Sequence, residues 1–169
     1  MDLYELSCAV EDYVITMRRE FHSHPEISFE EKRTTLRIKE ELEKAGIPHE
    51  TVGSGNIVGL IDTGKPGKKL AIRADIDALP MEEYDQTLSY RSQNPGVMHS
   101  CGHDGHTAML LGTAKALTEM TEDLCGKIYL CFQVAEEVGG GAGEIVEYLK
   151  SKGGVDCVIG THLDGGSDA

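Results

Sequence analysis

Apolar residues recur every three or four positions near the start of the chain, which is the spacing of one face of an α-helix. The pattern runs through residues 3–22 and predicts an amphipathic helix whose apolar face packs into a core. A second helix is predicted over residues 29–45, because Ser28 and Glu31 have the spacing of a capping box and Gly46 provides a helix stop. The chain therefore opens with two predicted helices.

The pattern then changes to short apolar runs separated by turns and helices. The longest run, residues 127–134, is apolar almost throughout, as expected of a strand covered on both faces. Residues 155–159 predict another buried strand. Strands that alternate with helices indicate an α/β domain with a mixed, partly parallel sheet flanked by helices. The predicted strands are 57–61, 70–75, 127–134 and 155–159, and the predicted later helices are 105–119 and 142–152.

The composition describes a soluble globular protein of one domain, with 169 residues of which 40% are hydrophobic and 27% charged. Sixteen Lys and Arg against 29 Asp and Glu leave a formal net charge of −13, so no basic surface is expected for nucleic acid. No apolar run approaches the ~20 residues of a membrane span, and the first residues lack the layout of a signal peptide. We therefore expect a cytoplasmic protein with no nucleic-acid or membrane partner.

The five cysteines are odd in number, and none of them forms a CxxC pair. Cys8, Cys131 and Cys157 lie in apolar sequence, which predicts small core residues rather than disulfides. Reduced cysteines agree with the expected cytoplasmic location.

The densest group of reactive side chains lies between His99 and His106, where three histidines, one cysteine and one aspartate occur together. Cys101 and His103 are two residues apart, so an extended backbone would place both side chains on one face. A thiolate beside an imidazole suits zinc and similar divalent ions. Two ligands do not complete a metal site, however, and the pair alone fits a polar loop with a buried cysteine better.

Further residues of metal-binding types come directly after the predicted strands. The carboxyl ends of parallel strands in an α/β sheet meet at one rim, where ligand sites gather. Cys101 precedes a predicted helix whose N-terminus is expected at the same rim and whose dipole favours an anionic thiolate. This convergence predicts a metal site. The candidates at the rim are Asp75, Asp77, Cys101, His103, Glu136, Glu137 and His162.

The candidates include more carboxylates than a closed structural zinc site requires. This surplus suits two divalent ions that share a water molecule, with one carboxylate left to carry a proton. In an extended backbone, Glu136 and Glu137 would point in opposite directions. One of them is then expected to bind metal while the other acts as general base. His22 and His24 are left outside the site, because Pro25 ends the helix and a surface turn explains both histidines equally well.

Five motifs follow one another in order along nearly the whole chain. They are Arg18-Arg19-Glu20-Phe21-His22 with Pro25-Glu26, Arg73-Ala74-Asp75-Ile76-Asp77-Ala78-Leu79-Pro80, Met98-His99-Ser100-Cys101-Gly102-His103-Asp104-Gly105-His106, Phe132-Gln133 with Ala135-Glu136-Glu137, and Gly160 with His162. The second and third are highly specific. With these motifs the chain resembles the metal-dependent amidohydrolases of the aminoacylase, hippurate hydrolase and indole-acetyl-amino-acid hydrolase group, which are relatives of the metallo-carboxypeptidases.

The resemblance implies a metallo-exopeptidase-like catalytic domain that hydrolyses the amide bond of a small N-acyl amino acid. It places Glu136 on the position of the general base and Asp77 on a position that orients the site. His99, Asp104 and His106 are then expected to be supporting or helix-facing residues rather than metal ligands. The implied cofactors are two divalent ions from among manganese, zinc, nickel and cobalt. The implied metal ligands are Cys101, His103, Glu137 and His162.

Members of this family are longer than 169 residues and insert a smaller dimerisation domain after the position of His162, before a further histidine ligand. We therefore expect residues 1–169 to be the N-terminal part of a truncated catalytic domain. Val134 also stands where the family usually has proline. The alternative function is a catalytically incomplete fragment that acts as a metal-binding or interaction module. An exposed strand edge would favour its self-association.

Overall fold

A computed structural model describes residues 3–163 of the chain. The helices are α1 (Leu3–Ala9), α2 (Glu11–Ser23), α3 (Lys32–Lys44), α4 (His103–Glu119) and α5 (Ala142–Ser151), with two 3₁₀ turns, η1 (Thr121–Asp123) and η2 (Glu136–Val138). The strands are β1 (His49–Val52), β2 (Asn56–Asp62), β3 (Lys69–Asp75), β4 (Lys127–Gln133) and β5 (Cys157–Gly160).

The five strands form one sheet in the order β1-β2-β4-β3-β5. The pairs β1–β2 and β2–β4 are antiparallel, whereas β4–β3 and β3–β5 are parallel. Helix α4 lies in the connection from β3 to β4, and α5 lies in the connection from β4 to β5. The mixed, partly parallel α/β sheet expected from the sequence is confirmed, and β1 is a strand that the sequence pattern did not predict.

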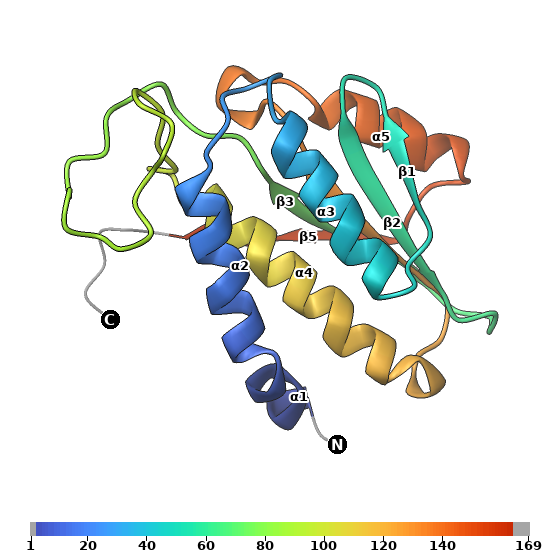
Figure 1. Cartoon of the computed structure of the whole chain (residues 1–169). Helices are drawn as coiled ribbons and strands as arrows, with labels where there is room; N and C mark the ends of the chain where they lie inside the picture. The colour runs from blue at the N-terminus through green and yellow to red at the C-terminus, as the bar shows by residue number, and fades with distance from the viewer. Residues whose placement is uncertain (1–2, 164–169) are drawn as a thin grey trace.

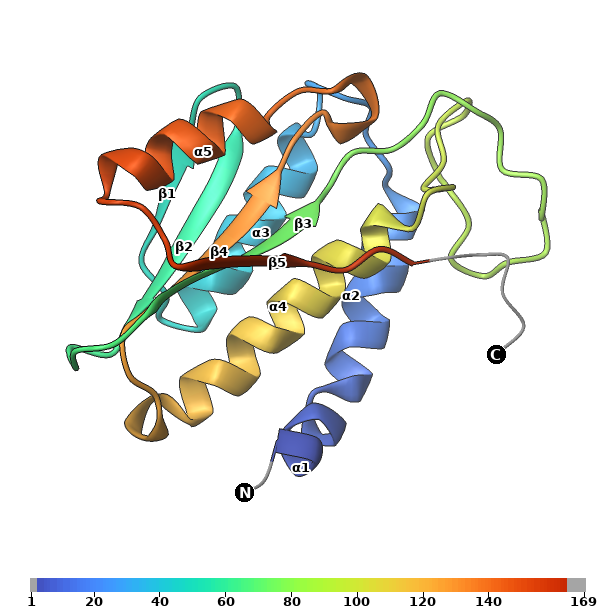
Figure 2. The ribbon, with the colours of Figure 1, turned by 180° about the vertical axis from the view of Figure 1, so that it is seen from behind.

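The sheet is covered on both faces (Figures 1 and 2). Helices α2, α3 and α4 lie on one face and α5 lies on the other. The buried apolar side chains form a larger and a smaller hydrophobic cluster. Strand β4 contributes to both, since Phe132 packs in the larger cluster and Cys131 packs in the smaller one. Burial of a side chain such as Phe132 contributes roughly 1.5–3 kcal/mol, so the near-continuous apolar run of β4 is explained by its two covered faces.

Two predictions for the N-terminal half of the chain are wrong. The predicted helix over 3–22 is divided at Val10, whose φ of −102° leaves helical geometry and whose N–H bonds to Ser7. The capping box is wrong, because neither of its side chains caps α3. The carboxylate of Glu26 instead accepts the first free amides of that helix, from Arg33 at 3.0 Å and Thr34 at 2.8 Å.

Strand β5 is exposed along its whole length, not buried as expected. It lies at the edge of the sheet and pairs with β3, and an apolar run cannot by itself distinguish an edge strand from a central one. Cys157 on this strand and Cys8 in α1 are also exposed, so of the three predicted core cysteines only Cys131 is buried. Among residues 3–163, no helix combines the length and the apolar character needed to cross a membrane.

Candidate functional site

Three parallel strands bring their carboxyl ends to one rim of the sheet. Asp75 ends β3, Gln133 ends β4 and Gly160 ends β5, and Asp75 and Gln133 are direct neighbours in the register. Helix α4 starts at this rim with His103, after Gly102 has turned the chain with a φ of +88°. The convergence expected from the sequence is therefore present in the structure, and it follows from the parallel pairing of β3 with its two neighbours.

His103 lies at the centre of the cluster. Its ring is fully buried, and Nδ1 lies 3.2 Å from Asp77 Oδ1. Its Nε2 faces three further carboxylates, at 3.6 Å from Asp75 Oδ2, 3.7 Å from Glu137 Oε1 and 3.9 Å from Glu136 Oε2. Burial opposes the charged form of the ring, but the bond to Asp77 and the surrounding carboxylates outweigh it and raise the pKa of His103.

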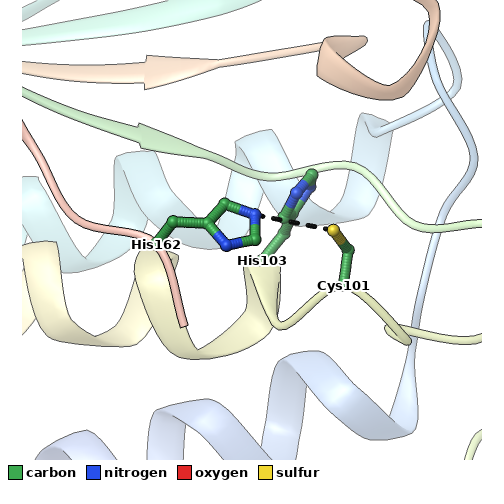
Figure 3. A group of neighbouring side chains, drawn as sticks. All are labelled: Cys101, His103 and His162. Atoms are coloured by element: carbon green, nitrogen blue, oxygen red, sulfur yellow. Dashed lines mark hydrogen bonds between the residues drawn. The ribbon is translucent and has the colours of Figure 1, made fainter. Parts of the chain in front are cut away.

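Cys101 and His162 approach the same ring from two different segments (Figure 3). Cys101 lies in the loop before α4 and His162 follows β5, and the distance from Cys101 Sγ to His162 Nε2 is 3.6 Å. Burial and the nearby carboxylate of Glu137 raise the pKa of the Cys101 thiol to about 11. In the metal-free chain this raised pKa favours the thiol over the thiolate, contrary to the expectation from the helix dipole, because burial and the nearby carboxylates oppose ionisation.

Glu136 and Glu137 lie in the 3₁₀ turn η2 rather than in extended backbone. Ala135, just before them, has a left-handed conformation with a φ of +57°. Both carboxylates consequently lie within 4 Å of His103 Nε2. The expectation that the two side chains point in opposite directions is therefore wrong. They differ instead in exposure, since the side chain of Glu136 is 37% exposed and that of Glu137 is 17% exposed.

Asp77 connects three segments of the site. Besides its contact with His103, it accepts hydrogen bonds through Oδ2 from Ser28 Oγ at 2.7 Å and from the backbone N–H of Glu137 at 3.0 Å. Burial would raise the pKa of this carboxyl, but the hydrogen bonds from His103, Ser28 and Glu137 outweigh burial and lower it. Asp77 is therefore an ionised acceptor that holds His103 and the η2 turn relative to each other.

Asp75 lies in the cluster, as expected from the sequence, and His106 joins it as well. His106 Nδ1 lies 2.5 Å from Asp75 Oδ1, and His106 Nε2 accepts the backbone N–H of Leu163 at 2.8 Å. The ring of His106 also meets that of His162 edge to face, with 4.8 Å between ring centroids. The available signal was helical spacing, because residues three apart, such as His103 and His106, share one face of a helix.

His22 takes part in a different buried group. Its Nδ1 lies 2.8 Å from Asp104 Oδ2 and its Nε2 lies 2.9 Å from Glu83 Oε1. The hydrogen bond to Asp104 is the largest contribution to the pKa of His22 and raises it. Burial lowers this pKa, but the bonds to Asp104 and Glu83 outweigh burial, so the pKa is raised. Both ring nitrogens are thus already bonded, and the group joins α2 to α4 and to the loop that contains Glu83.

Within residues 3–163, three sets of side chains have donor atoms close enough together to hold a metal ion, and all three include His103. His103 Nε2 and Glu137 Oε1 are buried, yet neither has a hydrogen-bond partner among residues 3–163. Buried polar atoms without partners are costly, and metal coordination would satisfy both. The donor set of thiolate, imidazole and carboxylate fits divalent transition ions. The three sets are Cys101 with His103 and His162, Asp75 with His103 and His106, and His103 with Glu136 and Glu137.

The chain matches the model of a known protein family. The model of the peptidase family M20/M25/M40 matches residues 71–169. The chain is 46% identical to an N-acyl-L-amino acid amidohydrolase from Geobacillus stearothermophilus over 89% of its own length and 40% of that protein. It is also 46% identical to an N-acetyl-L-cysteine deacetylase from Bacillus subtilis, over 90% of its own length and 36% of that protein.

A solved structure shows the same fold. It is a dinuclear metal-binding peptidase of the M20 family from Bacillus subtilis, 36% identical to the chain, with a TM-score of 0.84. The match covers 98% of the chain and 45% of that structure. The chain spans about two fifths of the length of the curated relatives it matches.

Proposed function

The chain belongs to the peptidase family M20/M25/M40, and from this premise we propose that it is the N-terminal part of a catalytic domain that hydrolyses N-acyl amino acids with the help of divalent metal ions. One observation carries the proposal. A thiol, imidazoles and carboxylates from four separate segments meet around His103 at the rim of the sheet. The relatives named as an N-acyl-L-amino acid amidohydrolase and an N-acetyl-L-cysteine deacetylase, each 46% identical to the chain where they align with it, support the proposal.

We assign the metal ligands among the residues around His103, and the donor types suit manganese, zinc, nickel or cobalt. Divalent ions held there would polarise the substrate carbonyl and make a water molecule acidic enough to react near neutral pH. The excess of carboxylates over a closed zinc site supports two ions rather than one. The proposed ligands are Cys101, His103, Glu137 and His162.

Glu136 is the proposed general base. Its carboxylate is the more exposed of the neighbouring pair and lies next to the proposed ligands, so it can reach both a water and a substrate. It would take one proton from the attacking water and return that proton to the leaving amine. The amide C–N bond is then replaced by a C–O bond, which gives a carboxylic acid and a free amino acid.

Asp77 is the proposed orienting residue. A carboxylate acceptor on Nδ1 fixes the direction of the His103 ring and leaves Nε2 directed at the proposed metal position. The same carboxylate accepts the backbone N–H of Glu137. The side chain of Asp77 therefore holds both His103 on α4 and Glu137 on η2, which are two of the proposed ligands.

The proposed substrate is a small N-acyl amino acid, and the proposed location is the cytoplasm. The amidohydrolase and deacetylase names of the relatives support this substrate class. All five cysteines are free in the structure, in agreement with a reducing compartment.

A direct test combines metal analysis with an activity assay on the 169-residue chain. The purified chain is loaded with Mn²⁺, Zn²⁺, Ni²⁺ or Co²⁺, its metal content is measured, and release of amino acid from hippurate and N-acetyl amino acids is followed. Bound metal together with turnover would support the proposal. The second candidate function, a metal-binding or interaction module, predicts bound metal without turnover. The exposed edge strand β5 favours self-association in that case, which sedimentation would detect.

A further inference from the structure

Two side chains of the segment before α3, those of Ser28 and Glu31, contact the site rather than the helix that they precede. Ser28 Oγ donates to Asp77, and the carboxylate of Glu31 accepts the backbone N–H of Ala135 at 2.8 Å. Glu31 and Ala135 are 104 residues apart in the sequence, and Glu31 is only 3% exposed. In Figures 1 and 2 the two segments lie side by side at the upper edge of the molecule. A buried carboxylate thus reaches the residue that immediately precedes Glu136.

Ala135 has an unusual backbone for a residue with a side chain. Its φ of +57° and ψ of +37° lie in the left-handed region, and the residue is completely buried. Alanine does not favour this conformation, so the contacts around the residue must maintain it. Glu31 holds its N–H, and its carbonyl accepts the N–H of Gly140 at 2.7 Å. Both polar groups of the Ala135 backbone are therefore fixed.

The left-handed turn determines where the neighbouring carboxylates go. Strand β4 ends at Gln133, and without the turn at Ala135 the chain would continue outward with Glu136 and Glu137 on opposite sides. With the turn, both carboxylates come within 4 Å of His103 Nε2. We propose that Glu31, through its bond to the Ala135 N–H, is a positioning residue that sets the direction of the η2 turn and thereby the metal affinity of the site.

This inference rests on the proposed function, because it assigns Glu31 a role toward the metal ions that the proposed function requires. The simpler explanation is that Glu31 only satisfies a buried N–H and stabilises the fold. If Glu31 positions the η2 turn, removal of its acceptor oxygen weakens metal binding by the folded chain. If Glu31 only stabilises the fold, metal binding by the folded chain stays unchanged.

Three variants separate the two explanations. Glu31→Gln keeps an oxygen that can accept the Ala135 N–H, whereas Glu31→Met keeps the side-chain length but removes the acceptor. Glu30→Met is the matched control, since the neighbouring Glu30 is 60% exposed and contacts Lys32 on the surface. Binding of Co²⁺ alone is measured from its visible absorption and its thiolate charge-transfer band. Hydrogen exchange of residues 133–141 is measured on the metal-free chains.

We expect the Co²⁺ dissociation constant to rise at least tenfold in Glu31→Met and to stay within about twofold in Glu31→Gln and Glu30→Met. Exchange in residues 133–141 should accelerate at least tenfold in Glu31→Met alone. Should Glu31→Met not fold, Glu31→Asp replaces it, because the shorter side chain keeps the charge but withdraws the oxygen from Ala135.

Two results would overturn the inference. One is unchanged Co²⁺ affinity in folded Glu31→Met, which would make Glu31 a stabilising residue only. The other is an equal loss of affinity in Glu31→Gln, which would mean that the acceptor to Ala135 is not what matters. If the unmodified chain binds no Co²⁺, the proposed function fails, and the exchange rates still decide whether Glu31 holds the turn.

Discussion

His103 Nδ1 and Asp77 Oδ1 lie 3.2 Å apart in a part of the site from which solvent is excluded. An ionised carboxylate can only accept a hydrogen bond, so Nδ1 carries the proton. In the neutral ring, Nε2 then has the free electron pair, directed toward Glu137. The pair therefore fixes both the tautomer and the direction of the central imidazole.

Replacing Asp77 by Asn should weaken metal binding about 10- to 100-fold, the range typical of residues that orient a metal ligand. The amide group cannot accept from His103, Ser28 and Glu137 at once, because one of its two ends is a donor. Isothermal titration with Zn²⁺ or Mn²⁺ measures the change. Ser28→Ala, which removes one of the three bonds, should cost only about threefold by the modest net value of one hydrogen bond. Equal losses in the two variants would contradict the orienting role of Asp77.

Glu136→Gln should abolish any hydrolysis while the metal content stays close to that of the parent chain. The amide retains the size of the carboxylate but cannot carry the proton, and loss of a general base typically lowers the rate about 10²- to 10⁴-fold. The matched variant is Glu137→Gln, which should lower the metal content first. Turnover comparable with that of the parent in Glu136→Gln would exclude this residue as the proton carrier.

Glu41 should make the stability of the chain depend on acid pH. Burial opposes its ionisation, but hydrogen bonds from Lys44, Tyr13 and Arg37 outweigh burial and lower the pKa of Glu41 from 4.5 to about 2. Because the folded-state pKa is below the ordinary value, the stabilisation is complete above pH 4.5 and is lost as the pH falls toward 2.

Glu41→Gln should therefore lower the free energy of unfolding at pH 7 by about 1.5–3 kcal/mol, the range for hydrogen bonds to a charged group. The difference from the parent should shrink as the pH falls from 4.5 to 2. Urea unfolding at several pH values measures it. Glu43→Gln, at a largely exposed position of the same helix, serves as the control. A difference that is independent of pH would show that Glu41 acts through packing rather than through its charge.

Gly112 allows α2 and α4 to approach closely. A methyl group added there would lie 2.3 Å from Val14 Cγ2, and the β-branched Val14 has little freedom to move away. Overpacking of this kind costs about 1–3 kcal/mol, which should exceed the gain of up to about 1 kcal/mol from the better helix propensity of alanine.

Gly112→Ala should consequently lower the melting temperature by about 2–6 °C, from the usual relation between stability and melting temperature for a chain of this size. Gly143→Ala is the counterpart, because nothing lies within 4 Å of a methyl group at that position of α5. It should leave the melting temperature unchanged or raise it. A rise in both variants would mean that α2 adjusts to the added methyl group at little cost.

The sequence predicted the architecture well where the signals were local. Apolar runs and their turns located β2, β3 and β4, and helical periodicity located α2, α4 and α5. The meeting of candidate residues at one rim also followed from the pattern, because strands joined through helices pair in parallel and end at the same edge.

Features that depend on distant partners could not be found in this way. Ser28 and Glu31 have the spacing of a helix cap, yet their partners are Asp77 and Ala135, 49 and 104 residues away. The left-handed turn at Ala135 likewise has no local signal, since alanine does not favour it. These tertiary contacts decided both where the two side chains point and how the neighbouring carboxylates face His103.

The edge position of β5 has a consequence for the order of events in folding. This strand is exposed and pairs with β3, so its detachment would break few buried contacts, and such segments open at a small fraction of the global unfolding energy. His162 follows directly after it, whereas Cys101 and His103 are held at the start of α4. We expect His162 to be the last residue to join the cluster as the chain folds and the first to leave it. If Cys101 and His162 hold metal as proposed, binding of the ion would connect the segment after β5 to the loop before α4 and so stabilise the pairing of β5 with β3.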